Sequence, residues 1–164
     1  MNGGFLLDTN IPSELMRPGP EPKVQNWLAA QDIRTLFLSV VSVGEMESGF
    51  ATTLDAARRV RLEASLARHL AHLFAGRVLP VTQSIAVRWG RLDGMRKMAG
   101  RPLSAPDGMI AATALEHDLT LVTRNVKDFA GLGVALLNPW DAVTEMLPGF
   151  LGGVLDVAPR VALG

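Results

Sequence analysis

Short apolar runs alternate with longer segments of helical periodicity along this chain. The runs fall at residues 5–7, 35–38, 78–81, 119–123 and 134–137, and their length is typical of buried strands. Apolar residues recur at helical spacing in the segments between them, at 21–31, from Ser42 onward, at 54–75 and at 83–99. Strands that alternate with helices form parallel sheets. We therefore expect an α/β fold in which a parallel sheet of four to five strands carries helices on both faces.

The length and composition fit one globular domain. The chain has 164 residues, of which 48% are hydrophobic and 20% are charged, and such a chain can bury a sizeable core. We place the domain at residues 1–147 and treat residues 148–164, which contain three glycine-bearing breaks and two prolines, as a C-terminal tail of unknown role. The sequence shows no cysteine, no secretory signal pattern and no apolar run of membrane-spanning length. This pattern is compatible with the cytoplasm.

The charge balance limits how the chain could bind nucleic acid. Sixteen Lys and Arg residues balance sixteen Asp and Glu residues, so contact with a polyanion requires a local basic cluster or bound cations. Such a cluster occupies the helix predicted at 83–99 and the loop after it, where Arg96, Lys97 and Arg101 could form an RNA-binding rim. A solvated helix face is the commoner explanation of such residues.

Two acidic residues follow the first two predicted strands. Asp8 is the first polar residue after the strand at 5–7, and ligands of open α/β sheets bind beyond the carboxyl ends of the strands. A turn or a helix cap would also explain Asp8. Glu45 lies near the start of the next helix, where Ser42 and Glu45 have the spacing of a capping box. Each acid alone therefore has a structural explanation.

A third acid, Asp107, lies in the segment SAPDGMIAATA at residues 104–114. Ser104 and Pro106 are typical of a helix start, and an acid in the first turn is stabilised by the helix dipole. These features leave Gly108 unexplained, since glycine inside a helix costs about 1 kcal/mol relative to alanine. Either a ligand approaches the backbone at Gly108, or a neighbouring helix packs tightly against it.

In a doubly wound sheet all three acids can face one crevice, together with the segment TRNVKDF after the fourth strand. Carboxylates brought this close raise one another's pKa. Hard divalent cations relieve that repulsion, and Mg²⁺ or Mn²⁺ suits a site built from oxygen ligands in a chain without cysteine. Such a pocket could hold a phosphate and activate water for attack on it.

Four motifs occur in order along residues 4–141: LLDTNIPSEL, SVVSVGEMESG, LSAPDGMIAATALEHDL and TLVTRNVKDF. Together they resemble the PIN-domain family and, more narrowly, the VapC-type toxins of bacterial toxin–antitoxin pairs. The resemblance implies a parallel α/β sheet, an acidic pocket that binds Mg²⁺ or Mn²⁺, and endoribonuclease activity on RNA. It also implies a VapB-like antitoxin as partner and a homodimeric toxin.

The same resemblance assigns roles to individual residues. Asp8, Glu45 and Asp107 match the family's catalytic acids and metal ligands, and Asn10 and Thr123 match residues that orient them. The family often has a fourth acid where this chain has Asn125, an amide that supplies no charge. Asp128 lies three residues later and is a further candidate ligand. The sequence therefore leaves open whether the predicted site binds one metal ion or two.

Two other functions fit the acidic pocket. One is a magnesium-dependent phosphoryl-transfer enzyme that uses Asp8 as nucleophile, although that chemistry usually needs a second aspartate where this chain has Asn10. The other is a binding module with little or no catalytic activity, an alternative that Asn125 keeps open.

Overall fold

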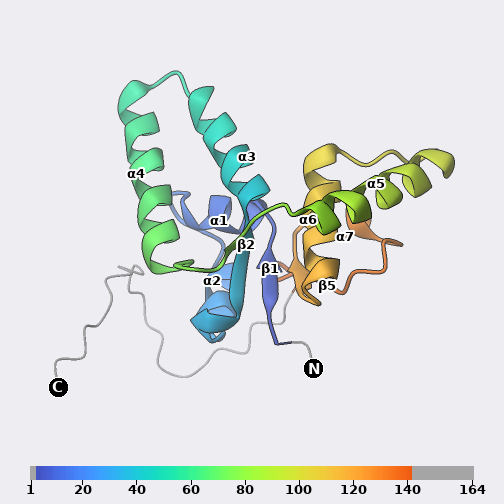
Figure 1. Ribbon diagram of the computed structural model, residues 1–164. Coiled ribbons are helices and arrows are strands. Elements are labelled where there is room, and N and C mark those ends of the chain that lie inside the picture. Colours follow the sequence, from blue (N-terminus) through green and yellow to red (C-terminus); the bar gives the residue numbers. More distant parts are fainter. Residues whose placement is uncertain (1–2, 142–164) are drawn as a thin grey trace.

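The computed structural model describes residues 3–141, in which five short strands form one parallel sheet (Figure 1). The strands are β1 (Phe5–Leu7), β2 (Leu36–Ser39), β3 (Val78–Leu79), β4 (Thr120–Val122) and β5 (Leu136–Leu137). They lie in the order β3-β2-β1-β4-β5. The chain therefore starts in the middle of the sheet, builds one side and then returns to build the other. This doubly wound arrangement confirms the predicted fold class and places the carboxyl end of β1 at the centre of one edge.

The helices connect successive strands. They are α1 (Asn10–Leu15), α2 (Pro22–Ala29), α3 (Val40–Ala51), α4 (Ala56–His72), α5 (Gln83–Met98), α6 (Ala105–Glu116) and α7 (Val126–Phe129), with a 3₁₀ turn at Ile33–Thr35. No helix within residues 3–141 is both long and apolar enough to cross a membrane. The tail predicted at 148–164 and the last residues of the predicted domain lie outside the described range.

Two apolar cores, one on each face, hold the helices to the sheet. Adjacent residues of β1 point to opposite faces: Leu6 belongs to the core shared with α5, α6 and α7, whereas Leu7 belongs to the core shared with α1, α2, α3 and α4. Figure 1 shows α1, α2 and α4 on one side of the sheet and α5, α6 and α7 on the other. Because both faces are covered, the strands are almost entirely apolar until each one ends.

Helix α3 begins earlier than the sequence predicts. Its N-cap is Ser39, whose Oγ accepts a hydrogen bond from the backbone N–H of Val41 at 3.1 Å. Ser42 is fully buried inside the helix, and its hydroxyl has no hydrogen-bond partner among the described residues. The predicted capping box between Ser42 and Glu45 is therefore wrong, and the carboxylate of Glu45 is left for another contact.

Gly108 is explained by helix packing. A Cβ atom at this position would lie 2.5 Å from Cδ1 of Trp89, which belongs to α5, and 2.8 Å from its Nε1. Helix α6 is buried along most of its length, and α5 crosses it at the point where a side chain is missing. Of the two explanations for Gly108, close packing of a neighbouring helix is confirmed, and the contact fixes the start of α6 next to Asp107.

Candidate functional site

The site is centred on Asp8, which follows β1 directly. The backbone N–H of Asp8 donates to the carbonyl of Val122 at 2.9 Å, so the residue continues the pairing of β1 with β4. Its side chain is buried, with 4% of the residue exposed. A carboxylate in this position needs hydrogen-bond donors, because the sheet and helices exclude water from it.

Three donors from two segments surround that carboxylate. The hydroxyl of Thr123 donates to Oδ2 at 2.7 Å, and the side-chain amide of Asn10 donates to the same oxygen at 3.2 Å. The backbone N–H of Thr9 donates to Oδ1 at 2.8 Å. The structure thus brings Asn10 and Thr123, to which the family resemblance assigns an orienting role, into direct contact with Asp8.

Burial raises the pKa of Asp8 to about 6. The hydrogen bonds from Thr123 and Thr9 act in the opposite direction, whereas the negative charges of Asp107 and Glu45 raise the pKa further. These two charges come from residues far from Asp8 in the sequence, Glu45 within α3 and Asp107 in the first turn of α6. Asp8 is partly desolvated and lies within electrostatic reach of two like charges.

Thr9 links Asp8 to Glu45, a role that the sequence did not suggest. Its hydroxyl donates to Oε1 of Glu45 at 2.6 Å, while its backbone N–H binds Asp8. Thr9 occupies the N-cap of α1, where a threonine hydroxyl usually accepts a backbone N–H, but here it forms no cap bond. The sequence could have indicated this role, because Thr9 lies between two expected site residues, Asp8 and Asn10.

Asp107 lies in the first turn of α6. The helix is capped by Ser104, whose Oγ accepts a hydrogen bond from the backbone N–H of Asp107 at 3.2 Å, as the sequence predicts. The carboxylate of Asp107 forms no hydrogen bond or ion pair with another described residue, in contrast to those of Asp8 and Glu45. Its position is therefore set by the backbone of α6 and by the packing of Trp89 on Gly108.

The segment after β4 places Asn125 near the site and Asp128 further along. The backbone N–H of Asn125 donates to the hydroxyl of Thr123 at 3.0 Å, which ties this residue to the group that binds Asp8. Asn125 is the N-cap of α7, but its side chain forms no cap bond. Asp128 is exposed on α7, and within residues 3–141 no hydrogen bond joins it to the three acids.

The predicted basic rim needs correction at Arg96. This residue is only 8% exposed, and its guanidinium donates to the backbone carbonyls of Arg101 at 2.8 Å, Ala130 at 3.1 Å and Asp128 at 3.2 Å. Because these bonds occupy the guanidinium, Arg96 braces the loop before α6 against α7 and does not face solvent. Lys97 is exposed but pairs with Asp93 at 2.7 Å, and Arg101 is exposed in the loop before α6.

The carboxylate oxygens of Asp8, Glu45 and Asp107 are suitable ligands for a hard divalent cation, but they are not close enough together to surround one. Within the described part of the chain, no three Asp, Glu or His side chains lie close enough together to hold a metal ion as they stand. The candidate metal ligands of these three acids are carboxylate oxygens, the ligand type that Mg²⁺ and Mn²⁺ prefer. A cation at Asp8 would also offset the burial and repulsion that raise its pKa.

Comparison with known sequences identifies the family of the chain. The family model of the PIN domain matches residues 5–133. Toxin FitB of Neisseria gonorrhoeae is 38% identical over 136 residues, which cover 83% of this chain and 98% of FitB. The VapC ribonuclease Y4jK of Sinorhizobium fredii is 35% identical over 137 residues, which cover 84% of this chain and 98% of that protein.

Solved structures agree with this assignment. The crystal structure of FitAcB from Neisseria gonorrhoeae matches with a TM-score of 0.78 and 37% identity, covering 84% of this chain and 99% of that one. The structure of VapBC2 from Rickettsia felis bound to a promoter DNA fragment has a TM-score of 0.69 and 21% identity, which supports the fold alone. Together with the doubly wound sheet, these matches show that the chain belongs to the PIN-domain family.

Proposed function

We propose that this protein is the toxin of a toxin–antitoxin pair and acts as a Mg²⁺- or Mn²⁺-dependent endoribonuclease. The observation that carries the proposal is the buried Asp8 carboxylate at the carboxyl end of β1, which Thr9 links to Glu45 and whose pKa the charges of Asp107 and Glu45 help to raise. The similarity to proteins named toxin FitB and VapC ribonuclease supports the same conclusion.

The three acids would hold the ion, and the bound ion would supply charge neutralisation at the scissile phosphate and a water of lowered pKa. Asp8 and Asp107 are the principal ligands in this proposal, and Glu45 completes the site or positions the attacking water. Thr123 and Asn10 fix the Asp8 carboxylate, since both donate to Oδ2. Thr9 is a positioning residue that keeps Glu45 beside Asp8.

The identity of residue 125 bears on whether the site binds one metal ion or two. The amide oxygen of Asn125 can bind a metal or a metal-bound water but brings no charge, and Asp128 is exposed on α7. We propose a single tightly bound ion, with Asn125 contacting its hydration shell. A weakly catalytic binding module remains the second candidate function, because the same lack of a fourth charge at Asn125 would weaken an ion required for turnover.

A cleavage assay separates these two functions. The purified protein is mixed with a fluorogenic RNA oligonucleotide, with Mn²⁺ or with a chelator, and Mn²⁺ binding is measured in parallel by calorimetry. The proposal predicts Mn²⁺ binding and Mn²⁺-dependent cleavage that Asp107→Asn removes while the folded state survives. Tight Mn²⁺ binding without cleavage of any RNA tested would instead establish the binding module.

A different Mg²⁺-dependent phosphoryl transfer, with Asp8 as nucleophile, predicts an acid-labile phosphate on Asp8. The Asp8 carboxylate accepts hydrogen bonds at both oxygens, from Thr9 at Oδ1 and from Thr123 and Asn10 at Oδ2. These contacts suit a fixed metal ligand better than a group that must attack a phosphate.

For partners, we propose a VapB-like antitoxin and a second copy of the toxin. The solved relatives include FitAB bound to an IR36 DNA fragment, which matches with a TM-score of 0.77 and 35% identity. Several large apolar side chains are exposed on the outer face of α5, namely Val87, Met95 and Met98, and this surface is the one we assign to the homodimer. Light scattering of the parent and of Met95→Glu would test that assignment, with a monomeric variant as the expected result.

A further inference from the structure

Arg124 lies directly beside the residues that hold Asp8. It follows Thr123, whose hydroxyl binds Asp8, and its backbone N–H donates to Oδ1 of Asn10 at 3.4 Å. These two contacts fix the backbone of Arg124 at the carboxyl ends of β1 and β4. The side chain is exposed, so it begins at the site and extends into solvent.

The guanidinium of Arg124 lies over an aromatic ring, and no carboxylate of residues 3–141 forms an ion pair with it. Its Cζ atom lies 5.4 Å from the centroid of the Trp140 ring. Five other basic residues of residues 3–141, among them Arg88 and Lys97, form ion pairs with Asp or Glu, and Arg124 is not among them. A cation over an aromatic face keeps its charge and its N–H groups available for another ligand.

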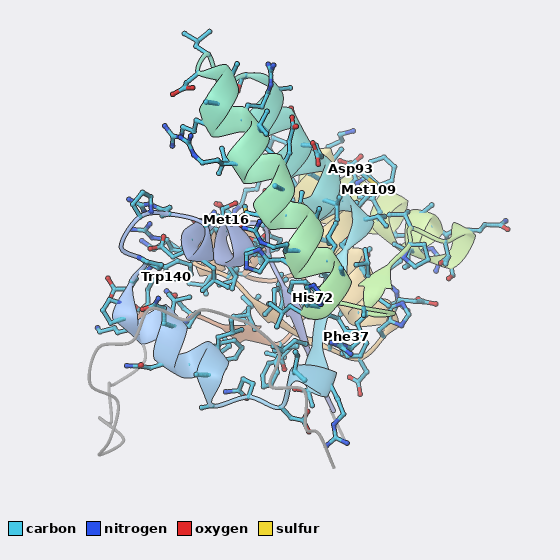
Figure 2. All side chains as sticks on the ribbon, turned by 90° about the vertical axis from the view of Figure 1, so that its left-hand side faces the viewer. Met16, Phe37, His72, Asp93, Met109 and Trp140 are labelled. Atoms are coloured by element: carbon cyan, nitrogen blue, oxygen red, sulfur yellow. The ribbon has the colours of Figure 1, made fainter. Side chains whose placement is uncertain are left out.

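The position of Trp140 is fixed by a backbone hydrogen bond and by packing of its ring against the core. Its backbone N–H donates to the side-chain oxygen of Asn138 at 3.1 Å, and its ring packs against the core that includes Val24 and Leu7. Figure 2 shows Trp140 on the same side of the molecule as Met16, at the end of α1, and Met16 belongs to the same packed cluster. The ring therefore defines where the guanidinium rests.

An RNA strand approaching the acids needs a cation at this point. Three carboxylates repel a polyanion, and a bound ion neutralises only the phosphate that it contacts. Arg96, which the sequence suggested for the flanking phosphates, is buried and bonded to carbonyls. Arg124 is an exposed cation whose backbone directly follows Thr123 and binds Asn10, two of the residues around Asp8.

We propose that Arg124, supported by Trp140, binds a backbone phosphate of the RNA strand next to the one that is cleaved. This inference rests on the proposed ribonuclease function and names a substrate contact of the same site. Arg124 would act in binding and would take no part in the chemical step. Removing its charge should therefore raise KM and leave kcat nearly unchanged.

The test compares Arg124→Gln, Arg124→Lys and a control, Arg61→Gln. Arg61 is exposed on α4, whose N-terminal half extends away from the sheet in Figure 1. The control therefore removes the same charge as Arg124→Gln but at a position away from Asp8. KM and kcat are measured on a single-stranded RNA oligonucleotide at several salt concentrations. Affinity for the same RNA is measured by fluorescence anisotropy in an Asp107→Asn background, which does not depend on turnover.

Arg124→Gln should raise KM and weaken RNA binding about fivefold and reduce the salt slope of log affinity by roughly 0.7, the value for one phosphate of a single strand. Arg124→Lys should keep the salt slope of the parent, because lysine keeps the positive charge. Its KM should lie between the values of the parent and of Arg124→Gln, because lysine loses the planar stacking of the guanidinium on Trp140. Arg61→Gln should match the parent. Equal RNA affinity and equal salt slope for the parent and Arg124→Gln would overturn the proposal.

Other outcomes are distinguishable. If the parent cleaves RNA and Arg124→Gln only weakens binding of an antitoxin, then Arg124 serves the protein partner and the RNA contact is refuted. If Arg124→Gln lowers kcat and leaves KM unchanged, then Arg124 acts in the chemical step and the binding role is wrong. A parent that neither binds nor cleaves RNA overturns the ribonuclease function and this contact together.

Discussion

The two halves of the acidic site are built differently. On the β1 side, the carboxylates of Asp8 and Glu45 receive hydrogen bonds from Thr9, Asn10 and Thr123. On the α6 and α7 side, the carboxylate of Asp107 and the side chain of Asn125 receive none from the described residues, and only their backbone is anchored. The first half is positioned by the protein before any ligand binds. The second half leaves its oxygens free for a cation or a substrate.

The largest effect on activity is expected from Asp107→Asn and Asp8→Asn. Each removes a charged ligand, so each should lower kcat by orders of magnitude. The halves should differ in stability. Asp107→Asn should leave the melting temperature of the metal-free protein close to that of the parent, because its carboxylate has no partner to lose. Asp8→Asn should change it, since this side chain is buried among donors. Parent-like cleavage by either variant would contradict the assigned site.

The next effect is a dependence of stability on pH in the metal-free protein. The pKa of Asp8 rises from 3.8 to about 6 on folding, so the folded state binds the proton more tightly. Stability from this group is therefore complete below about pH 4 and is lost as the pH rises through about 6, by up to about 3 kcal/mol at 1.4 kcal/mol per pKa unit. Chemical denaturation at pH 4.5 and 7.5 measures the difference. Asp8→Asn should flatten it, and an equal slope in parent and variant would refute burial as its cause.

Much of this site could be predicted from the sequence, because strand ends in a parallel sheet meet at one edge. Asp8 and Asp107 follow from that rule together with the helix-start pattern around Ser104. The sequence alone does not identify the cap of α3, because Ser39 and Ser42 are both candidates. The hydrogen bond from Val41 to Ser39 and the burial of Ser42 within the helix show that Ser39 is the N-cap. Arg96 was misplaced because a charge on a helix gives no sign that backbone carbonyls from α7 and a loop will surround it.

A smaller effect is expected from Thr9→Val, which keeps the size of the side chain and removes the hydroxyl that binds Glu45. Loss of one hydrogen bond to a charged group should lower Mn²⁺ affinity by about tenfold. Thr9→Ser should restore most of it, because the serine hydroxyl can still donate to Oε1. Calorimetry on both variants measures this effect without any assay of turnover. If Thr9→Ser is as weak as Thr9→Val, the hydroxyl is not what positions Glu45.

The smallest effect is expected on the other half, from Asn125→Asp. This change adds a fourth acidic side chain to the proposed site, and the Asn125 side chain forms no hydrogen bond within residues 3–141 that could be lost. We expect Mn²⁺ to bind a few-fold more tightly, with a second binding event at high Mn²⁺ concentration. Calorimetric stoichiometry measures both quantities, and Asp128→Asn is the matched control on exposed α7. Unchanged affinity and stoichiometry would mean that position 125 does not face the ion.

The most direct test is the shift in melting temperature caused by Mn²⁺ at pH 7.5, where Asp8 is charged. A ligand that binds only the folded state stabilises it by RT ln(1 + [L]/Kd), so the shift should grow with Mn²⁺ concentration in the parent. Asp8→Asn should show little shift, and Asp107→Asn should show a smaller shift than the parent. Equal shifts in all three proteins would contradict the claim that these acids converge to share a cation.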